Sequence, residues 1–392
     1  MITKVSLTNF KCFEEKTDFD LSKINLFTGL NGRGKSTVLQ ALLLLAQSVN
    51  KNGNIENLYV NGKYVSLDLF EDIVNFNSET NKSVTFGINT DNVTIQKLII
   101  SYQEQTDRVG NISEMKVNDK DYFQKGESLS GSKTDNDGNE SSRYLYSYPK
   151  QDINDLFCNY YFISANRLGP TRDESKADEY DLNPVGVFGE HRLNILSKST
   201  PINSVNFDQN KGCLLDETNK WLSYIMDGAS IDVLGKEKEN SVLQLTLCNN
   251  ANCDKKVKAI NFGFGYSYIL SIIITSLIAQ PGYTVFIENP EAHLHPRAQS
   301  RLTELLCKLA ESGVQVFVET HSEHVINSVR LCSLKDKFSL TNEDVSMYFF
   351  SEDFKSEKLI MDKEAQISNW PDGFFDQQEK DLSQILKLGL FK

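Results

Sequence analysis

The chain has 392 residues, and its 53 acidic side chains outnumber its 41 basic ones, which gives a formal net charge of −12. With 40% hydrophobic and 24% charged residues, the composition is that of a globular protein and excludes a mostly disordered or collagen-like chain. The acidic balance argues against a protein that coats nucleic acid through bulk charge, although it leaves room for a local basic groove. At roughly 150 residues per domain, we expect two to three compact units.

The sequence contains no segment that resembles a membrane anchor. Its longest apolar stretch, 269–279, is interrupted by Ser271, Thr275 and Ser276 and is shorter than the about 18 residues of a membrane span. The N-terminus begins with a strand pattern instead of the basic and apolar regions of a secretory signal. The seven scattered cysteines are typical of reduced thiols. We therefore expect a cytoplasmic protein.

The first half of the chain is rich in predicted strands. Strands are predicted at 3–8 and 23–27, followed by a helix over 38–47. Residues 58–102 alternate between apolar and polar types, with strands at 84–88 and 93–102, and predict an antiparallel β-rich insertion. Residues 103–142 are dominated by polar types, and we expect a long mobile loop there.

The second half of the chain alternates between strands and helices. After a strand at 160–163 we expect a helix over 214–226, a hairpin over 242–247 and 256–260, and a buried helix over 266–280. A fully apolar strand at 284–287, a helix over 296–312 and a strand at 314–318 follow. This order predicts an α/β fold with a mixed or parallel central sheet, a β-rich antiparallel insertion and a helical lobe.

A glycine-rich motif joins the second strand to the first helix. It contains the complete P-loop pattern Gly-x-x-x-x-Gly-Lys-Ser in strand–turn–helix order. In such a loop, backbone N–H groups turn toward the β-phosphate, Lys35 contacts the β- and γ-phosphate oxygens, and the Ser36 hydroxyl binds Mg²⁺. We therefore predict an ATP and Mg²⁺ site in which the nucleotide contacts Gly29, Asn31, Gly32, Arg33, Gly34, Lys35, Ser36 and Thr37.

Two acidic strand ends complete the predicted site. The apolar strand at 284–287 ends in Glu288, as in a Walker B element, and this carboxylate is predicted to hold Mg²⁺ together with Ser36. His321 follows the next strand, where a sensor of the γ-phosphate is expected. The predicted catalytic residues are Lys35, Glu288, Glu291 and His321.

These segments resemble the ABC-type ATPase heads of the RecF, Rad50 and SMC group, and within it the bacterial ATPases related to the overcoming-lysogenization-defect proteins. The similar segments are residues 7–13, residues 262–267 at the start of a helix, residues 288–296 and residues 319–322. Residues 164–170, 185–190 and 370–377 are similar to a subfamily with a short, uncharacterised C-terminal domain. The likeness runs from end to end and is weakest over 103–142.

The resemblance implies a P-loop NTPase of ABC-ATPase type. Its ATPase core would comprise 1–50 and 258–350, its β-rich insertion 51–160, its helical signature lobe 161–257 and its short C-terminal domain 351–392. It also implies a head-to-tail homodimer or higher homo-oligomer, in which Gly263, Gly265 and Ser267 of a second copy contact the γ-phosphate. By the same resemblance, His321 is the switch histidine and Lys11 lies near the nucleotide.

One position departs from the pattern of most ABC ATPases. The residue after the Walker B acid is usually the glutamate that activates water, and here it is Asn289, whose amide cannot act as a general base. Glu291 and Glu319 are the candidates to replace it. Because general-base assistance contributes roughly 10²–10⁴-fold in rate, we expect slow hydrolysis, with ATP acting mainly as a switch that holds the dimer closed.

Other constellations are interpreted as structural. The histidine pairs at 293/295 and 321/324 are explained by the ATP site instead of a transition-metal site. The spacing Cys248-x₄-Cys253 lacks the two further ligands of a zinc site. Arg33 and Arg167 either contact phosphate or tie loops together, and for Arg167 the structural role is favoured.

The resemblance suggests a role in defence. Overcoming-lysogenization-defect proteins carry a nuclease domain after the ATPase head, and the about 70 residues after His321 are too few for one. We therefore expect a separate protein effector, a nuclease or a toxin, and interpret the chain as the sensor or regulatory subunit of an antiphage system. Two alternatives stay open: an ATP-gated DNA-binding protein of repair or recombination, as in RecF, and a nucleotide-bound scaffold without turnover.

Overall fold

The computed structural model describes residues 1–78, 82–122, 148–176, 183–198, 202, 212–236, 241–248 and 256–390. The chain forms two compact units. The first contains Met1–Leu21 and Thr37–Asn159, and the second contains Ser22–Ser36 and Tyr160–Lys392.

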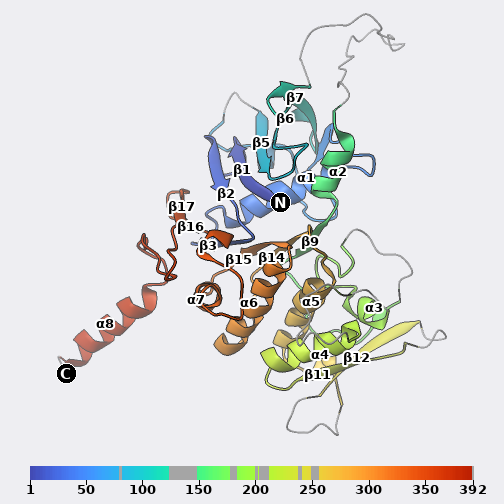
Figure 1. Ribbon diagram of the computed structural model, residues 1–392, viewed down its shortest axis with the longest axis vertical. Coiled ribbons are helices and arrows are strands. Elements are labelled where there is room, and N and C mark those ends of the chain that lie inside the picture. Colours follow the sequence, from blue (N-terminus) through green and yellow to red (C-terminus); the bar gives the residue numbers. More distant parts are fainter. Residues whose placement is uncertain are drawn as a thin grey trace, which may run out of the picture. The chain divides into compact units, whose positions relative to one another are not determined.

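The first unit is built on a seven-stranded antiparallel sheet in the order β2-β1-β5-β6-β7-β4, with β8 pairing with β7 (Figure 1). Alternation of buried and half-buried residues along β5 explains why this sequence forms a sheet with one face packed on a core. Its strands are β1 (Ile2–Thr8), β2 (Thr17–Asp20), β4 (Asn57–Tyr59), β5 (Ser83–Thr90), β6 (Lys97–Thr106), β7 (Val109–Val117) and β8 (Lys120–Asp121). The unit also holds most of α1 (Lys35–Ser48), the 3₁₀ helix η1 (Glu71–Ile73) and α2 (Lys150–Phe157).

One feature of this unit differs from the sequence-based expectations. The polar loop expected at 103–142 is wrong for residues 103–121, which complete β6 and form β7 and β8; residues 123–142 lie outside the described part of the chain. Strand β1 pairs antiparallel with β2 and β5 of this sheet. The boundaries of the expected ATPase core at 1–50 and of the insertion stay predictions.

The second unit contains the central sheet, which has six strands in the order β17-β16-β3-β15-β14-β9 (Figure 1). All neighbours are parallel except β16 and β17. The strands are β3 (Ile24–Gly29), β9 (Tyr160–Ile163), β14 (Thr284–Glu288), β15 (Gln315–Glu319), β16 (Val345–Phe350) and β17 (Ser356–Leu359). Every residue of β9, β15 and β16 is buried, as is usual in parallel sheets covered on both faces. The predicted mixed or parallel sheet is confirmed.

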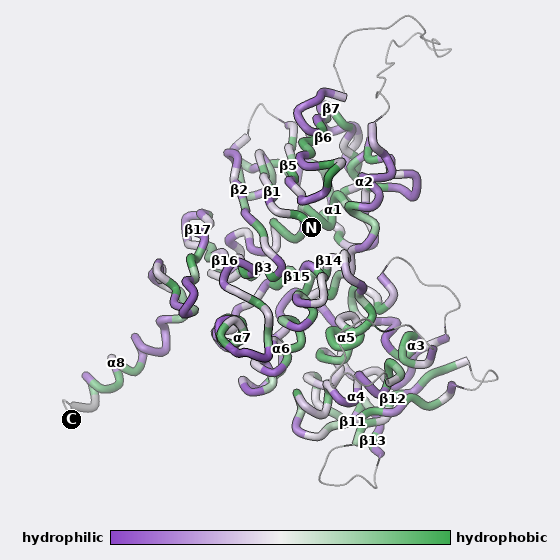
Figure 2. Tube along the Cα trace, viewed as in Figure 1, coloured by the Kyte–Doolittle hydropathy of each residue, from purple (hydrophilic) through white to green (hydrophobic). Residues whose placement is uncertain are grey.

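Helices α5 (Phe264–Ile278) and α6 (Pro296–Glu311) pack on this sheet, and α7 (Glu323–Cys332) packs against α6. The α5 sequence is apolar along nearly its whole length, and most of its residues are buried (Figure 2). Helix α6 begins at His295, whose side chain accepts a hydrogen bond from the Arg297 N–H, and continues with Pro296 in its first turn. The predicted helices at 266–280 and 296–312 are therefore confirmed to within about two residues at each end.

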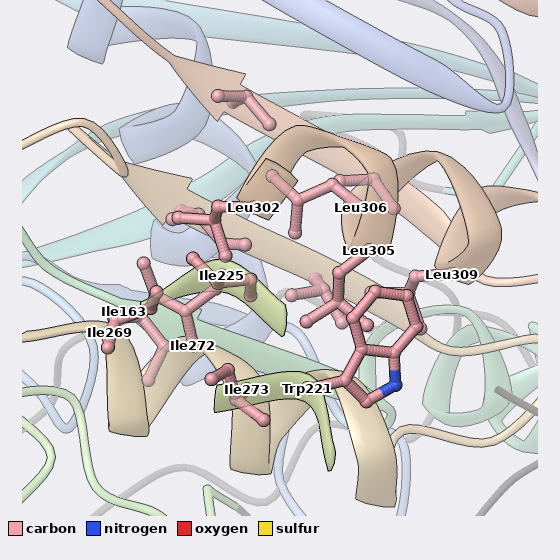
Figure 3. Packing of buried hydrophobic residues seen from close by; sticks show 14 of the residues in the cluster. Ile163, Trp221, Ile225, Ile269, Ile272, Ile273, Leu302, Leu305, Leu306 and Leu309 are labelled. Carbon is pink, nitrogen blue, oxygen red and sulfur yellow. The ribbon is translucent and has the colours of Figure 1, made fainter. Parts of the chain in front are cut away.

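A smaller sheet and α4 (Leu214–Ile225) pack against α5. The sheet has four strands in the order β10-β12-β11, with β13 pairing with β12. Figure 3 shows Trp221 and Ile225 of α4 among isoleucines of α5 and leucines of α6. The remaining elements are β10 (Glu174–Ser175), α3 (Arg192–Ser197), β11 (Ser230–Leu234), β12 (Val242–Cys248), β13 (Val257–Lys258), the 3₁₀ helix η2 (Ala259–Asn261) and η3 (Asn342–Asp344).

The second unit ends in α8 (Gln377–Leu390). Its side chains Leu382, Ile385 and Leu386 are exposed, and Figure 2 shows apolar and polar residues mixed along it. Among the described residues, we find no helix that has both the length and the apolar character needed to span a membrane.

Candidate functional site: a phosphate loop facing two carboxylates

The predicted phosphate loop lies between β3 and α1. Three of its residues, Gly29, Gly32 and Gly34, have positive φ angles of 128°, 71° and 103°. A Cβ atom on Gly29 would stand 2.3 Å from the Phe350 carbonyl oxygen of β16, so this position accepts no larger residue. No atom lies within 4 Å of a Cβ built on Gly32, which leaves open space beside the turn. The strand–turn–helix arrangement predicted from the sequence is confirmed.

Lys35 lies folded within this loop. Lys35 is only 3% exposed. Its Nζ donates to the carbonyls of Leu30 at 2.6 Å and Gly29 at 3.1 Å. Burial lowers the pKa of Lys35, while the charge of Glu319 acts in the opposite direction. The loop carbonyls therefore hold the ammonium where a phosphate on the loop would meet it.

Two carboxylates end neighbouring strands of the sheet. Glu288 and Glu319 are register partners at the carboxyl ends of the parallel strands β14 and β15. The Ser36 hydroxyl lies close enough to the Glu319 carboxyl to lower its pKa. Glu319 is 6% exposed, and its Oε2 is buried without a hydrogen-bond partner among the described residues. Glu319 is thus the buried carboxylate that faces the P-loop serine.

The environment of Glu319 disfavours its ionised form. Burial raises its pKa to about 7, and the charges of Glu288 and Glu291 act in the same direction. The Ser36 hydroxyl and the charge of Lys35 oppose this rise without cancelling it. A buried acid with one unpartnered oxygen is unusual and points to a functional group.

The Glu288 carboxylate is held by the chain that follows β9. Its Oε2 accepts hydrogen bonds from the Ala165 N–H at 2.9 Å and the Ser164 hydroxyl at 3.2 Å. The structure therefore confirms that Glu288 ends the apolar strand. Its contact with Mg²⁺ stays a prediction.

Glu291 connects two turns at the same edge of the sheet. Its carboxylate accepts from the His321 N–H at 2.7 Å, the Thr320 hydroxyl at 2.8 Å and the Asn289 amide at 3.5 Å. Both oxygens are therefore occupied by this network, in contrast to the free oxygen of Glu319.

His321 lies beside Lys35 at the end of β15. Burial and the Lys35 charge lower its pKa, so its imidazole is neutral near pH 7. A neutral imidazole can accept or donate one hydrogen bond to a phosphate, as the predicted sensor role requires. That role stays a prediction.

The structure gives other contacts for some predicted site residues. Lys11 and Thr37 belong to the first unit, where the Lys11 Nζ donates to Gln40 at 2.6 Å and the Cys12 thiol donates to Thr37. Their contacts with nucleotide stay predictions. Arg33 lies with its guanidinium 4.7 Å from the ring centre of Phe354, and Asn31 is exposed.

The predicted signature residues lie at the start of α5. Gly263 caps the helix, and a Cβ built on it has no neighbour within 4 Å. Gly265 packs closely, since its Cβ would lie 2.7 Å from the His293 carbonyl oxygen. Ser267 is only 2% exposed, so Gly263 is the most accessible of the three. Their contact with the nucleotide of a second copy stays a prediction.

Sequence reasoning treated Glu319 only as a second candidate base and missed its position next to Ser36 and Lys35. The available signal was an acid at the end of a buried strand, directly before Thr320 and His321. The same pattern at Glu288 was recognised. The strand at 160–163 was expected, but not its position as the edge strand of the central sheet beside β14.

Comparison with known proteins places this chain in a family. Residues 1–326 match a family described as "AAA ATPase domain", and residues 340–385 match one described as a protein of unknown function. A segment of 54 residues is 41% identical to the Old nuclease of Escherichia phage P2, but it covers only 12% of this chain and 9% of that protein.

Solved structures show the same fold at low sequence identity. A structure of the SMC head bound to the C-winged helix domain of ScpA is 12% identical, with a TM-score of 0.51, and the match covers 91% of this chain and 96% of that one. An SMC head from Pyrococcus furiosus with an extended coiled coil, bound to the C-terminal domain of ScpA, is 11% identical, with a TM-score of 0.50 over 98% and 99% of the two chains. The chain therefore has an SMC-head-like P-loop ATPase fold.

Proposed function

Because the chain belongs to the AAA ATPase domain family, an ATPase family, we propose that it binds ATP and Mg²⁺ at the carboxyl ends of β3, β14 and β15 and hydrolyses ATP slowly to ADP and phosphate. One observation carries this proposal: the buried Glu319 carboxyl lies within electrostatic reach of both Ser36 and Lys35 of the P-loop, at the carboxyl end of β15. These three groups are a hydroxyl, a carboxylate and a cation, the set that a P-loop ATPase needs.

The residues present fit a nucleotide with its metal ion. Gly32 leaves space beside the loop, and Glu319 has an oxygen without a partner. Ser36 and Glu288 would hold Mg²⁺, whose positive charge, when bound, offsets that of the phosphates. Lys35 would exchange its two carbonyl contacts for phosphate oxygens.

We assign the acceptor of the water proton to Glu319. Asn289 cannot accept this proton as a general base, and both oxygens of Glu291 accept hydrogen bonds from its neighbours. The unpartnered Oε2 of Glu319 is available for a water molecule. Glu291 would instead hold the 320–321 backbone in position.

The ATPase assignment is tested on the purified protein with Mg²⁺ and ATP. Lys35→Ala should abolish hydrolysis and weaken ATP binding, because the loop loses its cation. Glu319→Gln should leave binding intact and lower the turnover rate by roughly 10²–10⁴-fold. Glu291→Gln is the matched control, because it neutralises a nearby carboxylate. It should lower the turnover rate much less than Glu319→Gln does. Full activity of Lys35→Ala would overturn the assignment of the site.

The finer part of the proposal is that ATP joins two copies head to tail. Its support is the open N-terminus of α5 at Gly263, since a helix N-terminus attracts anions. The apolar side chains Ile260 and Phe264 beside it are 53% and 54% exposed. Analytical ultracentrifugation of Glu319→Gln should show dimers with ATP and monomers with ADP; a monomer under both conditions would contradict the dimer.

We further propose that this switch regulates a separate effector, a nuclease or a toxin, in cytoplasmic antiphage defence. Its support is the similarity of one segment to the phage P2 Old nuclease. Cells carrying the gene with its neighbouring reading frame should resist phage infection, and Lys35→Ala should remove that resistance. Equal sensitivity with and without the gene, together with ATP-strengthened and salt-dependent duplex binding, would favour the DNA-binding alternative.

A further inference from the structure

The segment 164–170, which follows β9 and is called the strap here, lies between the Glu288 turn and the start of α5. At its first residues, Ser164 and Ala165 donate to the Glu288 carboxylate. At its other end, a Cβ on Gly169 would stand 2.5 Å from the ring of Phe264 in the first turn of α5. The strap therefore contacts both the predicted metal ligand and the predicted signature helix.

Arg167, in the middle of the strap, contacts both the turn after Glu288 and helix α5 with one side chain. Its guanidinium donates to the Glu288 carbonyl at 2.7 Å through one nitrogen and to the Asn289 carbonyl at 2.6 Å through the other. The same guanidinium lies 5.0 Å from the ring centre of Tyr268 in α5, at cation–π distance. Thus Arg167 bridges the Walker B turn and the second turn of α5.

The burial of Arg167 is costly, which argues against a passive packing role. The residue is 3% exposed, and no carboxylate among the described residues forms an ion pair with its guanidinium. Burial lowers its pKa to about 10, against the nearby charges of Glu291 and Glu288. An unpaired buried charge is destabilising, so Arg167 depends on the backbone carbonyls of Ser164, Glu288 and Asn289 that accept its hydrogen bonds.

The turn after Glu288 also packs directly on the start of α5. His293 lies edge-on to the Tyr268 ring, with the centroids 4.8 Å apart, and 5.5 Å from the Phe264 ring. Asn289 and His293 both hold positive φ angles, of 45° and 61°. Since the turn is tightly constrained, a shift of the α5 N-terminus would be transmitted to the Glu288 and Asn289 backbone.

We propose that Arg167 is a positioning residue that couples the start of α5 to the Glu288–Asn289 turn, so that contact of a second copy's nucleotide with Gly263 aligns the hydrolytic carboxylates of the same chain. This inference rests on the proposed ATPase dimer and adds a link between its two ATP sites.

The test compares Arg167→Lys with Arg192→Lys in the full chain. Arg192 is also buried and donates to carbonyls of the strap, at Leu168 and Gly169, but makes no contact with Glu288 or Asn289. Lysine retains the charge and loses the two-pronged donor geometry. We expect Arg167→Lys to lower kcat by about 10–100-fold, as for residues that orient metal ligands, with KM for ATP within about twofold and the Hill coefficient reduced to one.

A second pair of variants separates coupling from folding. Tyr268→Phe keeps the aromatic face and should behave like the wild type, whereas Tyr268→Leu should reproduce the low kcat and the lost cooperativity. The inference is overturned if Arg167→Lys lowers kcat no more than Arg192→Lys at an equal loss of thermal stability, or if only KM changes. Failure of the proposed function itself would appear differently, as a wild-type protein without ATP turnover.

Discussion

Glu319→Gln should stabilise the protein at alkaline pH in the absence of nucleotide and metal. The pKa of Glu319 is raised to about 7 from an ordinary value of 4.5, because the carboxyl is buried beside two other acids. Between these values the folded state keeps a proton that the unfolded state has released. The free energy of unfolding therefore falls as pH rises through this window, by at most about 1.4 kcal/mol per pH unit.

From pH 4.5 to 7, the free energy of unfolding of the wild type falls by up to about 3 kcal/mol relative to that of the glutamine variant. This difference levels off above pH 7. The assay is urea unfolding from pH 4.5 to 8 in EDTA, followed by the fluorescence of Trp221, which is buried in the same unit. The exposed Glu352→Gln is the control and should run parallel to the wild type. If the free energy of unfolding of Glu319→Gln also follows that of the wild type at every pH, burial does not raise the pKa of Glu319.

Three further substitutions test the fold around the site. Gly29→Ala, measured by binding of a fluorescent ATP analogue and by thermal unfolding, should abolish binding and destabilise the protein by about 1–3 kcal/mol, because φ is 128° and the new Cβ would meet Phe350. Glu304 has its pKa lowered to about 2: burial raises it, but hydrogen bonds from two lysines and Tyr224 outweigh this. The stability it contributes is therefore present above pH 4.5 and lost as pH falls toward 2, and Glu304→Gln should remove this dependence in acid titrations. Trp221→Ala should cost about 3–5 kcal/mol in urea unfolding, since it leaves a cavity between α4 and α6; a loss under 1 kcal/mol would contradict that packing.

Much of the second unit could be predicted because its signals are local. The phosphate loop is one contiguous motif, and β14 and β15 are short apolar runs that end in acids. Helix boundaries at α6 follow from His295 and Pro296, which stand next to each other in the sequence. Such features depend on neighbouring residues and not on the tertiary fold.

What could not be predicted depends on contacts between distant segments. In β7, polar residues such as Asn111 and Glu114 alternate with buried Ile112 and Met115, and a composition that is polar on average concealed this alternation. Likewise, Glu319 lies near Ser36 only because β3 and β15 are neighbours in the sheet. Register across a sheet is fixed by pairing, for which no single segment carries a signal.

The contact between the nucleotide loop and β16 has a consequence for biosynthesis. The Phe350 carbonyl accepts a hydrogen bond from the Leu30 N–H, and β16 runs alongside β3 from Val345↔Ile24 to Phe350↔Gly29. A ribosome thus makes the glycine-rich segment long before the strand that pairs with it. Until β16 is synthesised, the nascent polypeptide carries the motif without this partner strand, and the β16-facing edge of β3 is open to wrong pairing.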